Sequence, residues 1–396
     1  MKIGLLTTRL FDEPRNGGEI CTARLLHTIV DAGHDALVIG RGPVPSPGMR
    51  GARYRSVGPL VEPFESLSAR RRVGSLCTAL LTRQASTVQR LAEGATPRRV
   101  KQELQAESGM DVLIADHLQV LPWVLGPGRK LPALLVVMHN VESDNYAEWA
   151  RRAGQRGDWL RQRILQREAR LLHRLECEAL RRAEVLACLS RGDADRLLAT
   201  ARTCGGRAQV EVLPSFPLDT GLQSQAGSGE GPDRRIGMIG TWTWEPNRLG
   251  LQWMLDHVLP RLPPACVLVL AGPGLEGLEL PRGVVWLGSV ARALDFYRSV
   301  DVVALSSHVG TGVQEKAVEA IAAARLVVAT PHSLRGLRAD LPSHVRVTDD
   351  AGQFARLCAD APLGADPAWS GSVKTWREAR RVRYADVLGR CLATAH

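Results

Sequence analysis

The residues best suited to chemistry stand in segment 310–329, where two glycines precede a charged helix and an apolar strand. Gly310 and Gly312 leave the backbone free to turn its amides outward, and the first amides of a helix have no partner within it. Aligned peptide dipoles favour negative charge there by about 0.3–1 kcal/mol, and Lys316 adds a full positive charge. The segment therefore predicts a binding site for a diphosphate.

A second charged residue on the same helix indicates what accompanies the phosphates. Glu319 follows Glu315 by one helical turn, and a diphosphate would repel its carboxylate. A hydroxyl of a sugar or ribose is its more natural partner, so the ligand is expected to carry hydroxyls beside phosphates. An ordinary helix start with two solvated charges stays open as the alternative, because glycine-rich loops before helices are common.

Residues 310–337 resemble the donor-site segment of retaining glycosyltransferases of family 4, which have the GT-B fold. The likeness is carried by Lys316, Glu319, Ala320, the strand end 327–330 and the pair Gly336-Leu337. The resemblance implies that Glu319 binds the nucleotide ribose, and that Lys316 acts with the donor-phosphate residues Gly310, Thr311, Gly312 and Val313. Thr311 stands where the family has its first glutamate, so the carboxylate usually found near the donor sugar is absent.

Two segments of the first half resemble the same family in the same order. Gly17 and Gly18 follow the apolar strand 1–8, and the family places such a pair against the donor phosphates and the acceptor. The resemblance implies that Glu19, at the start of the helix near 19–32, faces the acceptor.

His139 ends the apolar run 134–139, where the family keeps a histidine near the transferred sugar. Glu142 is close enough in sequence to orient its ring. A hydrogen-bonded histidine at a strand end is the alternative, and Asp116-His117 at another strand end is a further candidate.

The loop after residue 239 resembles the family loop that approaches the donor diphosphate. The resemblance implies contacts from Gly240 and Thr241, with Arg248 taking the place of the family's lysine. A planar guanidinium and a compact ammonium bind phosphate differently, so this is a departure from the family pattern.

Apolar runs alternate with helix-like segments along the whole chain, which predicts parallel sheets covered on both faces. We expect strands at 3–7, 36–39, 112–115, 134–138 and 185–188, and a second series at 236–239, 267–271, 284–287, 302–305, 326–329 and 345–347. The predicted fold class is α/β of the GT-B type, with two Rossmann-like doubly wound parallel-sheet domains facing across a cleft. The first domain spans 1–218, 219–235 is a Gly/Ser-rich linker, 236–368 binds the nucleotide sugar, and a helix at 369–396 returns to the first domain.

The formal net charge is +10, and arginines crowd the first half of the chain. From Leu160 onward apolar residues recur at helical spacing while arginines occupy the other positions. A solvated helix face explains this pattern, and contact with an anionic membrane or a lipid-diphosphate acceptor is the open alternative. Nucleic acid is not expected as a partner, because aromatic residues make up only 5% of the chain and no reading module is recognised.

Length and composition, 396 residues with 45% hydrophobic content, are those of a folded globular protein. No apolar run approaches the roughly 20 residues that span a bilayer. The eight scattered cysteines show neither disulfide nor zinc spacing, which favours a reducing compartment. We expect a cytoplasmic location, with peripheral contact at the inner face of the membrane left open, as is the oligomeric state.

These residues together predict a retaining glycosyltransferase that moves a sugar from a nucleoside-diphosphate sugar to a hydroxyl acceptor in carbohydrate biosynthesis. His139, Glu319 and Lys316 are the expected catalytic residues. No Asp-x-Asp pair follows a predicted strand of the proposed site, so neither a metal nor a cofactor is expected. Two alternatives stay open: a sugar-nucleotide epimerase or hydrolase on the same fold, and a catalytically silent nucleotide-sugar-binding partner protein.

Overall fold

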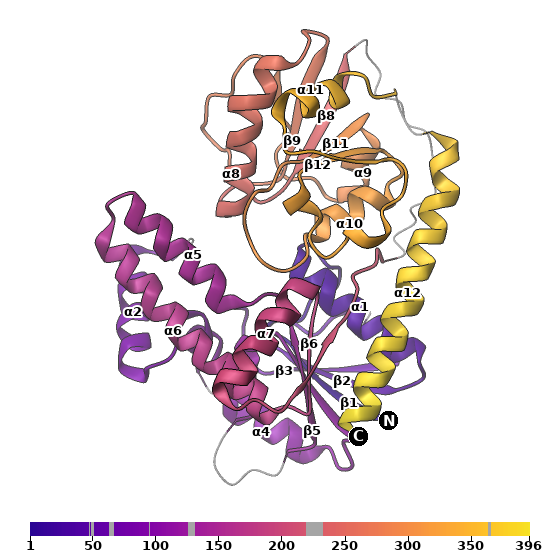
Figure 1. Ribbon diagram of the computed structural model, residues 1–396. Coiled ribbons are helices and arrows are strands. Elements are labelled where there is room, and N and C mark those ends of the chain that lie inside the picture. The colour runs from indigo at the N-terminus through magenta and orange to yellow at the C-terminus, as the bar shows by residue number, and fades with distance from the viewer. Residues whose placement is uncertain are drawn as a thin grey trace. The chain divides into compact units, whose positions relative to one another are not determined.

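The computed structural model describes residues 1–46, 48, 51–62, 67–94, 96–125, 131–218, 233–362 and 366–396. The chain divides into two compact units (Figure 1). Unit 1 contains Met1–Leu213 and Ala385–His396, and unit 2 contains Pro214–Tyr384. Most of the predicted linker, residues 219–232, lies outside the described residues.

Unit 1 is built on a seven-stranded sheet in the order β3-β2-β1-β4-β5-β6-β7, in which every neighbouring pair is parallel. The strands are β1 (Lys2–Leu6), β2 (Asp35–Gly40), β3 (Ala52–Ser56), β4 (Val112–Asp116), β5 (Ala133–Met138), β6 (Val185–Cys188) and β7 (Gln209–Val212). All five residues of β4 are buried, so helices must cover both faces of the sheet. The strand order reverses between β1 and β4, where ligands of such sheets bind beyond the carboxyl ends.

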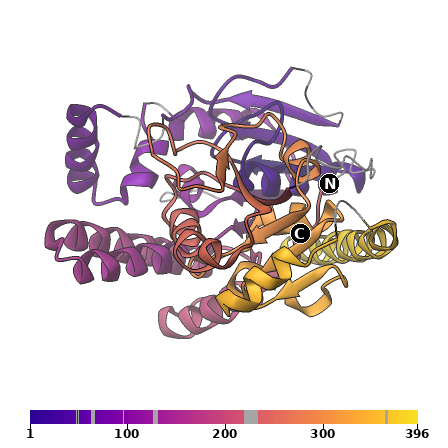
Figure 2. The ribbon, with the colours of Figure 1, turned by 90° about the horizontal axis from the view of Figure 1, so that it is seen from above.

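The helices of unit 1 connect these strands. They are α1 (Gly17–Asp31), α2 (Ala69–Thr82), α3 (Ser86–Leu91), α4 (Thr96–Ala106), α5 (Glu142–Gln155), α6 (Trp159–Arg182) and α7 (Arg191–Cys204). Helices α5 and α6 pack along each other as an antiparallel pair joined by a short turn (Figures 1 and 2). Leu172 and Leu180 of α6 are fully buried and anchor this pair to the sheet core.

Unit 2 repeats the same architecture with six parallel strands in the order β10-β9-β8-β11-β12-β13. The strands are β8 (Arg234–Ile239), β9 (Cys266–Ala271), β10 (Val284–Trp286), β11 (Val302–Leu305), β12 (Leu326–Ala329) and β13 (Val345–Val347). The helices are α8 (Glu245–Trp253), α9 (Ala293–Arg298), α10 (Glu315–Ala322), α11 (Ala351–Ala359) and α12 (Pro367–Ala395). Separate hydrophobic clusters cover the two faces of the sheet, one around Phe354 and one around Phe296.

Helix α12 contributes to both units. Trp376 packs into the core of unit 2, and the Nε of Arg380 donates a hydrogen bond to the carbonyl of Ser215 at 2.7 Å. The residues after Tyr384 belong to unit 1, where Leu388 and Cys391 are buried.

The strands expected from the apolar runs are all present, within about two residues of their predicted ends. The doubly wound parallel-sheet class is therefore confirmed for both units. Strand β3 was not predicted, because its sequence Ala-Arg-Tyr-Arg-Ser is polar and it pairs at the edge of the sheet.

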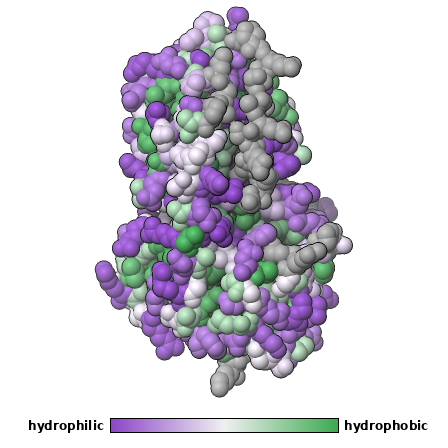
Figure 3. All heavy atoms as spheres, turned by 90° about the vertical axis from the view of Figure 1, so that its right-hand side faces the viewer, coloured by the Kyte–Doolittle hydropathy of each residue, from purple (hydrophilic) through white to green (hydrophobic). Residues whose placement is uncertain are grey.

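On the face that Figure 3 presents, hydrophilic residues predominate and hydrophobic ones are scattered among them. Hydrophobic residues scattered singly over a surface are normal for a folded protein and need no partner. Within the described residues, no helix combines the length and the apolar character needed to cross a bilayer.

Candidate functional site

Two strand ends of unit 1 bring a carboxylate and an imidazole together. Asp116 ends β4 and His139 follows β5, and these strands are neighbours in the sheet. The Nε2 of His139 lies 2.7 Å from the Oδ1 of Asp116, and both side chains are buried. The Oγ1 of Thr22, on α1, donates to the second carboxylate oxygen at 2.5 Å. Asp116 thus fixes the orientation of the His139 ring.

His117 lies against the same pair. Its ring centroid is 3.7 Å from that of His139, and its φ of 82° is in the left-handed region, which non-glycine residues rarely adopt. A Cβ atom at Gly18 would come within 3.3 Å of the His117 ring. Gly18 therefore leaves space for the His117 ring, whether or not its backbone also contacts a ligand.

The charges of this cluster follow from its burial. Burial alone would raise the pKa of Asp116, but the charge and hydrogen bond of His139 hold it below its usual value. Burial, with the neighbouring His139, lowers the pKa of His117 to about 3. At neutral pH the cluster therefore contains an ionised Asp116 and a neutral His117.

Asp116, His117 and His139 also form a group in the described part of the chain whose ligand atoms lie within 4.8 Å of one another. A metal ion there would have to replace the hydrogen bond between Asp116 and His139. The two imidazoles pack against each other, with ring centroids 3.7 Å apart and an interplanar angle of 33°. The arrangement fits an oriented hydrogen-bonding group better than a metal centre.

Glu142 and Glu19 have other partners. The carboxylate of Glu142 accepts a hydrogen bond from Asn140 at 3.4 Å, and burial raises its pKa, an effect that Asn140, Gln119 and the charge of His139 reduce. Glu19 accepts from the backbone amide of Arg15 at 2.7 Å and pairs with Arg9 at 3.0 Å. Glu19 therefore holds the loop before α1, and its side chain is only 4% exposed.

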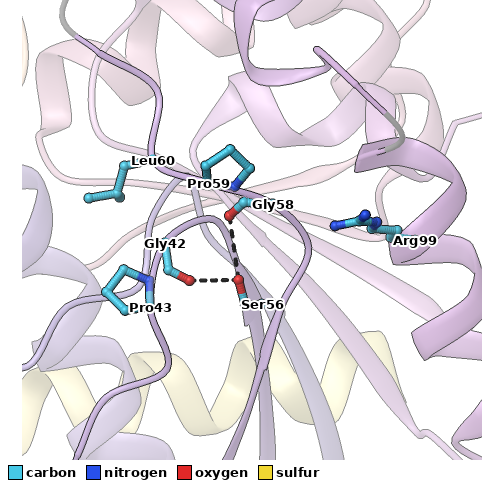
Figure 4. A pocket seen from close by; sticks show the side chains of 7 residues that line it. All are labelled: Gly42, Pro43, Ser56, Gly58, Pro59, Leu60 and Arg99. Carbon is cyan, nitrogen blue, oxygen red and sulfur yellow. Dashed lines mark hydrogen bonds between the residues drawn. The ribbon is translucent and has the colours of Figure 1, made fainter.

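A hollow of about 460 Å³ opens at the carboxyl ends of β2 and β3 (Figure 4). Gly42, Pro43, Ser56, Gly58, Pro59, Leu60 and Arg99 line it. The Oγ of Ser56 is engaged with the carbonyl of Gly42 at 2.6 Å, so Arg99 of α4 is the charged group that the hollow offers to a ligand. It lies at the same edge of the sheet as Asp116, since all strands run parallel.

In unit 2, the loop between β11 and α10 is held by residues that follow β12. Gly310 and Gly312 have φ values of 109° and 71°, which favour glycine. The guanidinium of Arg335 donates to the carbonyl of Thr311 through Nη2 at 3.0 Å and Nε at 3.3 Å, and His332 contacts the carbonyl of Gly310 at 3.0 Å. These hydrogen bonds use the carbonyl groups of Gly310 and Thr311 and fix the conformation of the loop.

Lys316 stands in the first turn of α10, and its Nζ donates to the Oδ1 of Asn247 at 2.8 Å. Burial lowers the pKa of Lys316 to about 8, and the positive charge of Arg335 adds to this effect. Two cationic groups therefore share the surroundings of the Gly310 loop. Their mutual repulsion, and the positive end of the α10 dipole, favour an anion at this place.

The two glutamates of α10 have separate surroundings. Glu315 is buried and accepts a hydrogen bond from the Oγ of Ser215 at 2.8 Å. Glu319, one turn later, is partly exposed, and its charge raises the pKa of the buried Tyr297 further beyond the effect of burial. Glu319 is therefore the carboxylate of this helix that a ligand can reach.

The segment after β8 contacts the same helix through Asn247, which lies in the first turn of α8. The Nδ2 of Asn247 donates to the carbonyl of Thr241 at 3.0 Å, while its oxygen accepts from Lys316. Arg248 has an exposed side chain. Gly272 has a φ of 103°, and a Cβ there would lie 2.0 Å from the carbonyl oxygen of Gly240, so no other residue fits beside this loop.

The predicted residues thus fall into two groups, each within one unit. Gly17, Gly18, Glu19 and His139 lie in unit 1, whereas Gly240, Thr241, Arg248, Gly310, Thr311, Gly312, Val313, Lys316 and Glu319 lie in unit 2. Sequence reasoning missed Arg335, His332, the contact of Asn247 with Lys316, and the pairing of Asp116 with His139. For Asp116, His139, His332 and Arg335 the available signal was a position at or a few residues beyond the carboxyl end of a strand.

Comparisons with known proteins match this architecture. Residues 233–360 match the family described as glycosyl transferases group 1. The chain is similar to the structure of Anabaena Alr3699/HepE in complex with UDP and glucose, at 17% identity and a TM-score of 0.62, covering 99% of each chain. It is similar to sucrose-phosphate synthase from Thermosynechococcus elongatus, at 15% identity and a TM-score of 0.60, covering 98% of this chain and 97% of that one.

A third similar structure is the α,α-trehalose 6-phosphate synthase of Burkholderia multivorans, at 12% identity and a TM-score of 0.62, covering 99% of this chain and 98% of that one. Identities this low show the fold, and the predicted GT-B class is confirmed by them. No curated protein matches the sequence.

Proposed function

We propose that the protein moves a sugar from a nucleoside-diphosphate sugar to a hydroxyl acceptor with retention of configuration. The match of residues 233–360 to the glycosyl transferases group 1 supports this proposal and agrees with the family predicted from the sequence. The observation that carries the proposal is the Gly310 loop, with Lys316 beside it and Arg335 bonded to it. Departure of a nucleoside diphosphate leaves negative charge on its phosphate oxygens. Preorganised cations and amides at that place lower the barrier to departure.

Each residue of unit 2 takes a part in this proposal. Lys316 donates a charged hydrogen bond to the diphosphate, and the amides at Gly310, Thr311, Gly312 and Val313 contribute further donors. Arg335 positions the loop through Thr311 and adds positive charge. Glu319 accepts from a ribose hydroxyl. Gly240 and Thr241 bring the β8 loop to the phosphates, with Arg248 as an exposed additional cation.

Unit 1 supplies the groups proposed to act on the sugar and the acceptor. His139, held by Asp116, donates or accepts a hydrogen bond at the reacting sugar. Gly17 and Gly18 give close backbone approach at the start of α1. The hollow beside Arg99 offers a place for the acceptor. Since Glu19 is engaged with Arg9 and Arg15, we propose that it acts on the acceptor by holding this loop in shape.

The first experiment screens nucleoside-diphosphate sugars for thermal stabilisation of the protein. UDP-glucose is the first probe, because the Anabaena relative was solved with UDP and glucose. A ligand that binds only the folded state at about a hundred times its Kd stabilises it by about 2.7 kcal/mol. We expect one nucleotide series to raise the melting temperature, and the Glu319→Ala protein to lose that response for nucleotides but not for inorganic diphosphate.

Turnover with the donor so identified then separates the three candidate functions. A transferase releases nucleoside diphosphate faster when acceptors are added, and NMR of the product shows the anomeric configuration of the donor. Donor loss without any acceptor at the same rate would favour an epimerase or hydrolase. Stabilisation by a nucleotide sugar without turnover under any condition would favour a silent binding protein.

A further inference from the structure

Two helices of unit 1 expose large apolar side chains that the sheet core does not use. On α2, Val73 is 60% exposed and Leu81 is 85% exposed. On α6, Trp159 is 66% exposed and Leu160 is 56% exposed. Isolated exposed apolar residues are ordinary, whereas exposed apolar residues on neighbouring helices, with charged groups beside them, favour a partner.

The two helices are in contact. The Nη2 of Arg167, in the middle of α6, donates to the carbonyl of Ala79 near the end of α2 at 2.6 Å and approaches the carbonyl of Gln84 at 3.4 Å. Figure 1 draws α2 beside α6 on the side of unit 1 where the α5–α6 pair lies. The exposed residues of both helices are therefore treated as one surface, the α2–α6 surface.

This surface is strongly basic. Helix α6 contains seven arginines and three glutamates. Arg161, Arg163, Arg170 and Arg174 are exposed and form no ion pair with any carboxylate of the described residues. By contrast, Glu168 and Glu176 are buried, the first bonded to Ser86 and Arg167 and the second to Ser143.

The spacing of these residues places the charges beside the apolar side chains. Residues three and four apart lie on one face of a helix, so Leu160, Arg163, Arg167, Arg170 and Arg174 share one face of α6. Trp159 lies at the start of that face. Arginines that share a helix face with an exposed leucine and tryptophan suit the headgroup layer of a membrane, where indole rings also prefer to lie.

We propose that the α2–α6 surface binds an anionic lipid bilayer, with Trp159 and Leu160 inserted at the headgroup level and the arginines on lipid phosphates. A second copy of the chain is a poorer fit, because a symmetric contact would bring the same uncompensated positive charges together. The proposal does not depend on the nature of the reaction. It concerns where the protein works, and it is tested without any nucleotide sugar.

Flotation of the full chain with vesicles tests the proposal. Vesicles of phosphatidylglycerol and phosphatidylcholine in equal parts are compared with vesicles of phosphatidylcholine alone. We expect binding to the first and not to the second, and a decline in binding as salt is added. Each arginine near an anionic surface contributes about a fivefold increase in affinity, so Arg163→Glu, Arg170→Glu and Arg174→Glu combined lower it by at least on the order of a hundredfold.

A matched control variant carries the same number of charge reversals on other helices of unit 1. Arg98→Glu, Lys101→Glu and Arg202→Glu combined alter exposed residues of α4 and α7 in the same unit and should leave binding within a few-fold of wild type. The Trp159→Ser, Leu160→Ser protein should lose the binding that persists at high salt, whereas Leu198→Ser on α7 should keep it. A blue shift of tryptophan emission on vesicle addition should disappear with Trp159→Ser.

Three results would overturn the proposal. One is equal loss of binding from the control triple variant, which would indicate non-specific attraction to a basic protein. Another is wild-type flotation that does not depend on phosphatidylglycerol. The third is a dimer in vesicle-free solution that the Trp159→Ser, Leu160→Ser change dissociates, which would make the α2–α6 surface a subunit interface.

Discussion

The Lys316→Ala protein binds the diphosphate of the donor more weakly than the wild type, by about one to two orders of magnitude. Lys316 donates a charged hydrogen bond from a half-buried position, and such a bond is worth about 1.5–3 kcal/mol. Titration calorimetry with UDP, or with the nucleotide that the stabilisation screen selects, measures the loss. Lys374→Ala is the control, because Lys374 is an exposed lysine of α12 in the same unit.

The pH dependence of this affinity follows from the pKa of Lys316. Its value of about 8 in the free protein means that the ammonium is present below that pH and is lost as the pH rises through it. Affinity is therefore steady at neutral pH and declines above pH 8 toward that of Lys316→Ala, which should show no such decline. Bound diphosphate raises the pKa of Lys316, so the ammonium of the complex loses its proton only at higher pH. The affinity therefore stops declining above that higher pKa.

Arg335 connects the two observations. The positive charge of Arg335 helps to lower the pKa of Lys316, so the Arg335→Gln protein should lose affinity only at higher pH. The same substitution removes the hydrogen bonds from Arg335 to the carbonyl of Thr311, which hold the Gly310 loop in place. If Lys374→Ala weakens binding as much as Lys316→Ala does, or if the affinity of the Lys316→Ala protein keeps the wild-type pH profile, Lys316 does not contact the diphosphate.

The Asp116→Asn protein turns over its donor about a hundredfold more slowly, with a KM for the donor close to that of the wild type. Asp116 accepts the hydrogen bond of the His139 Nε2, which fixes one tautomer of the ring and its orientation. An amide cannot hold that tautomer as a carboxylate does, and misplaced proton-transfer or hydrogen-bonding groups cost about 10²-fold or more. Steady-state kinetics gives kcat and KM separately.

Two further measurements distinguish this positioning role from a merely structural one. Thr22→Val removes the other hydrogen bond to Asp116 but leaves His139 in place, so its effect on kcat should be much smaller. Nitrogen NMR of the His139 ring should report a protonated Nε2 in the wild type and in Thr22→Val, but a mixture of tautomers in Asp116→Asn. An unchanged kcat in a folded Asp116→Asn protein rules out the role assigned to the pair.

The strands could be predicted because both sheets are buried on two faces, so their central strands are continuous apolar runs in the sequence. Residues 112–115 and 302–305 are examples. It does not predict β3, since Arg53 and Arg55 alternate with less polar residues at an exposed sheet edge. Helix α11 was also not predicted. Its start depends on Asp350, whose side chain accepts from the amide of Gln353, a cap that is recognised only once the helix is known.

The site is predicted only where its residues are contiguous in the chain. Gly310, Gly312 and Lys316 form one loop and helix start, and their positions follow from local geometry. Arg335 reaches this loop from beyond β12, through a turn that Thr330 caps. Such a contact depends on the order of strands in the sheet, which the spacing of residues does not reveal. The same holds for Asp116 and His139, which are 23 residues apart and meet because β4 and β5 pair.

Hydrogen–deuterium exchange with and without the nucleoside diphosphate tests the central claim most directly, because the claim concerns backbone amides. The account predicts slower exchange, on adding UDP or the nucleotide selected by the screen, in peptides that contain Gly310 to Lys316. At a nucleotide concentration near the wild-type Kd, the Lys316→Ala protein should show little of this protection. Binding of the nucleotide with protection confined to other segments, while the Gly310 loop exchanges as it does in the free protein, would contradict it.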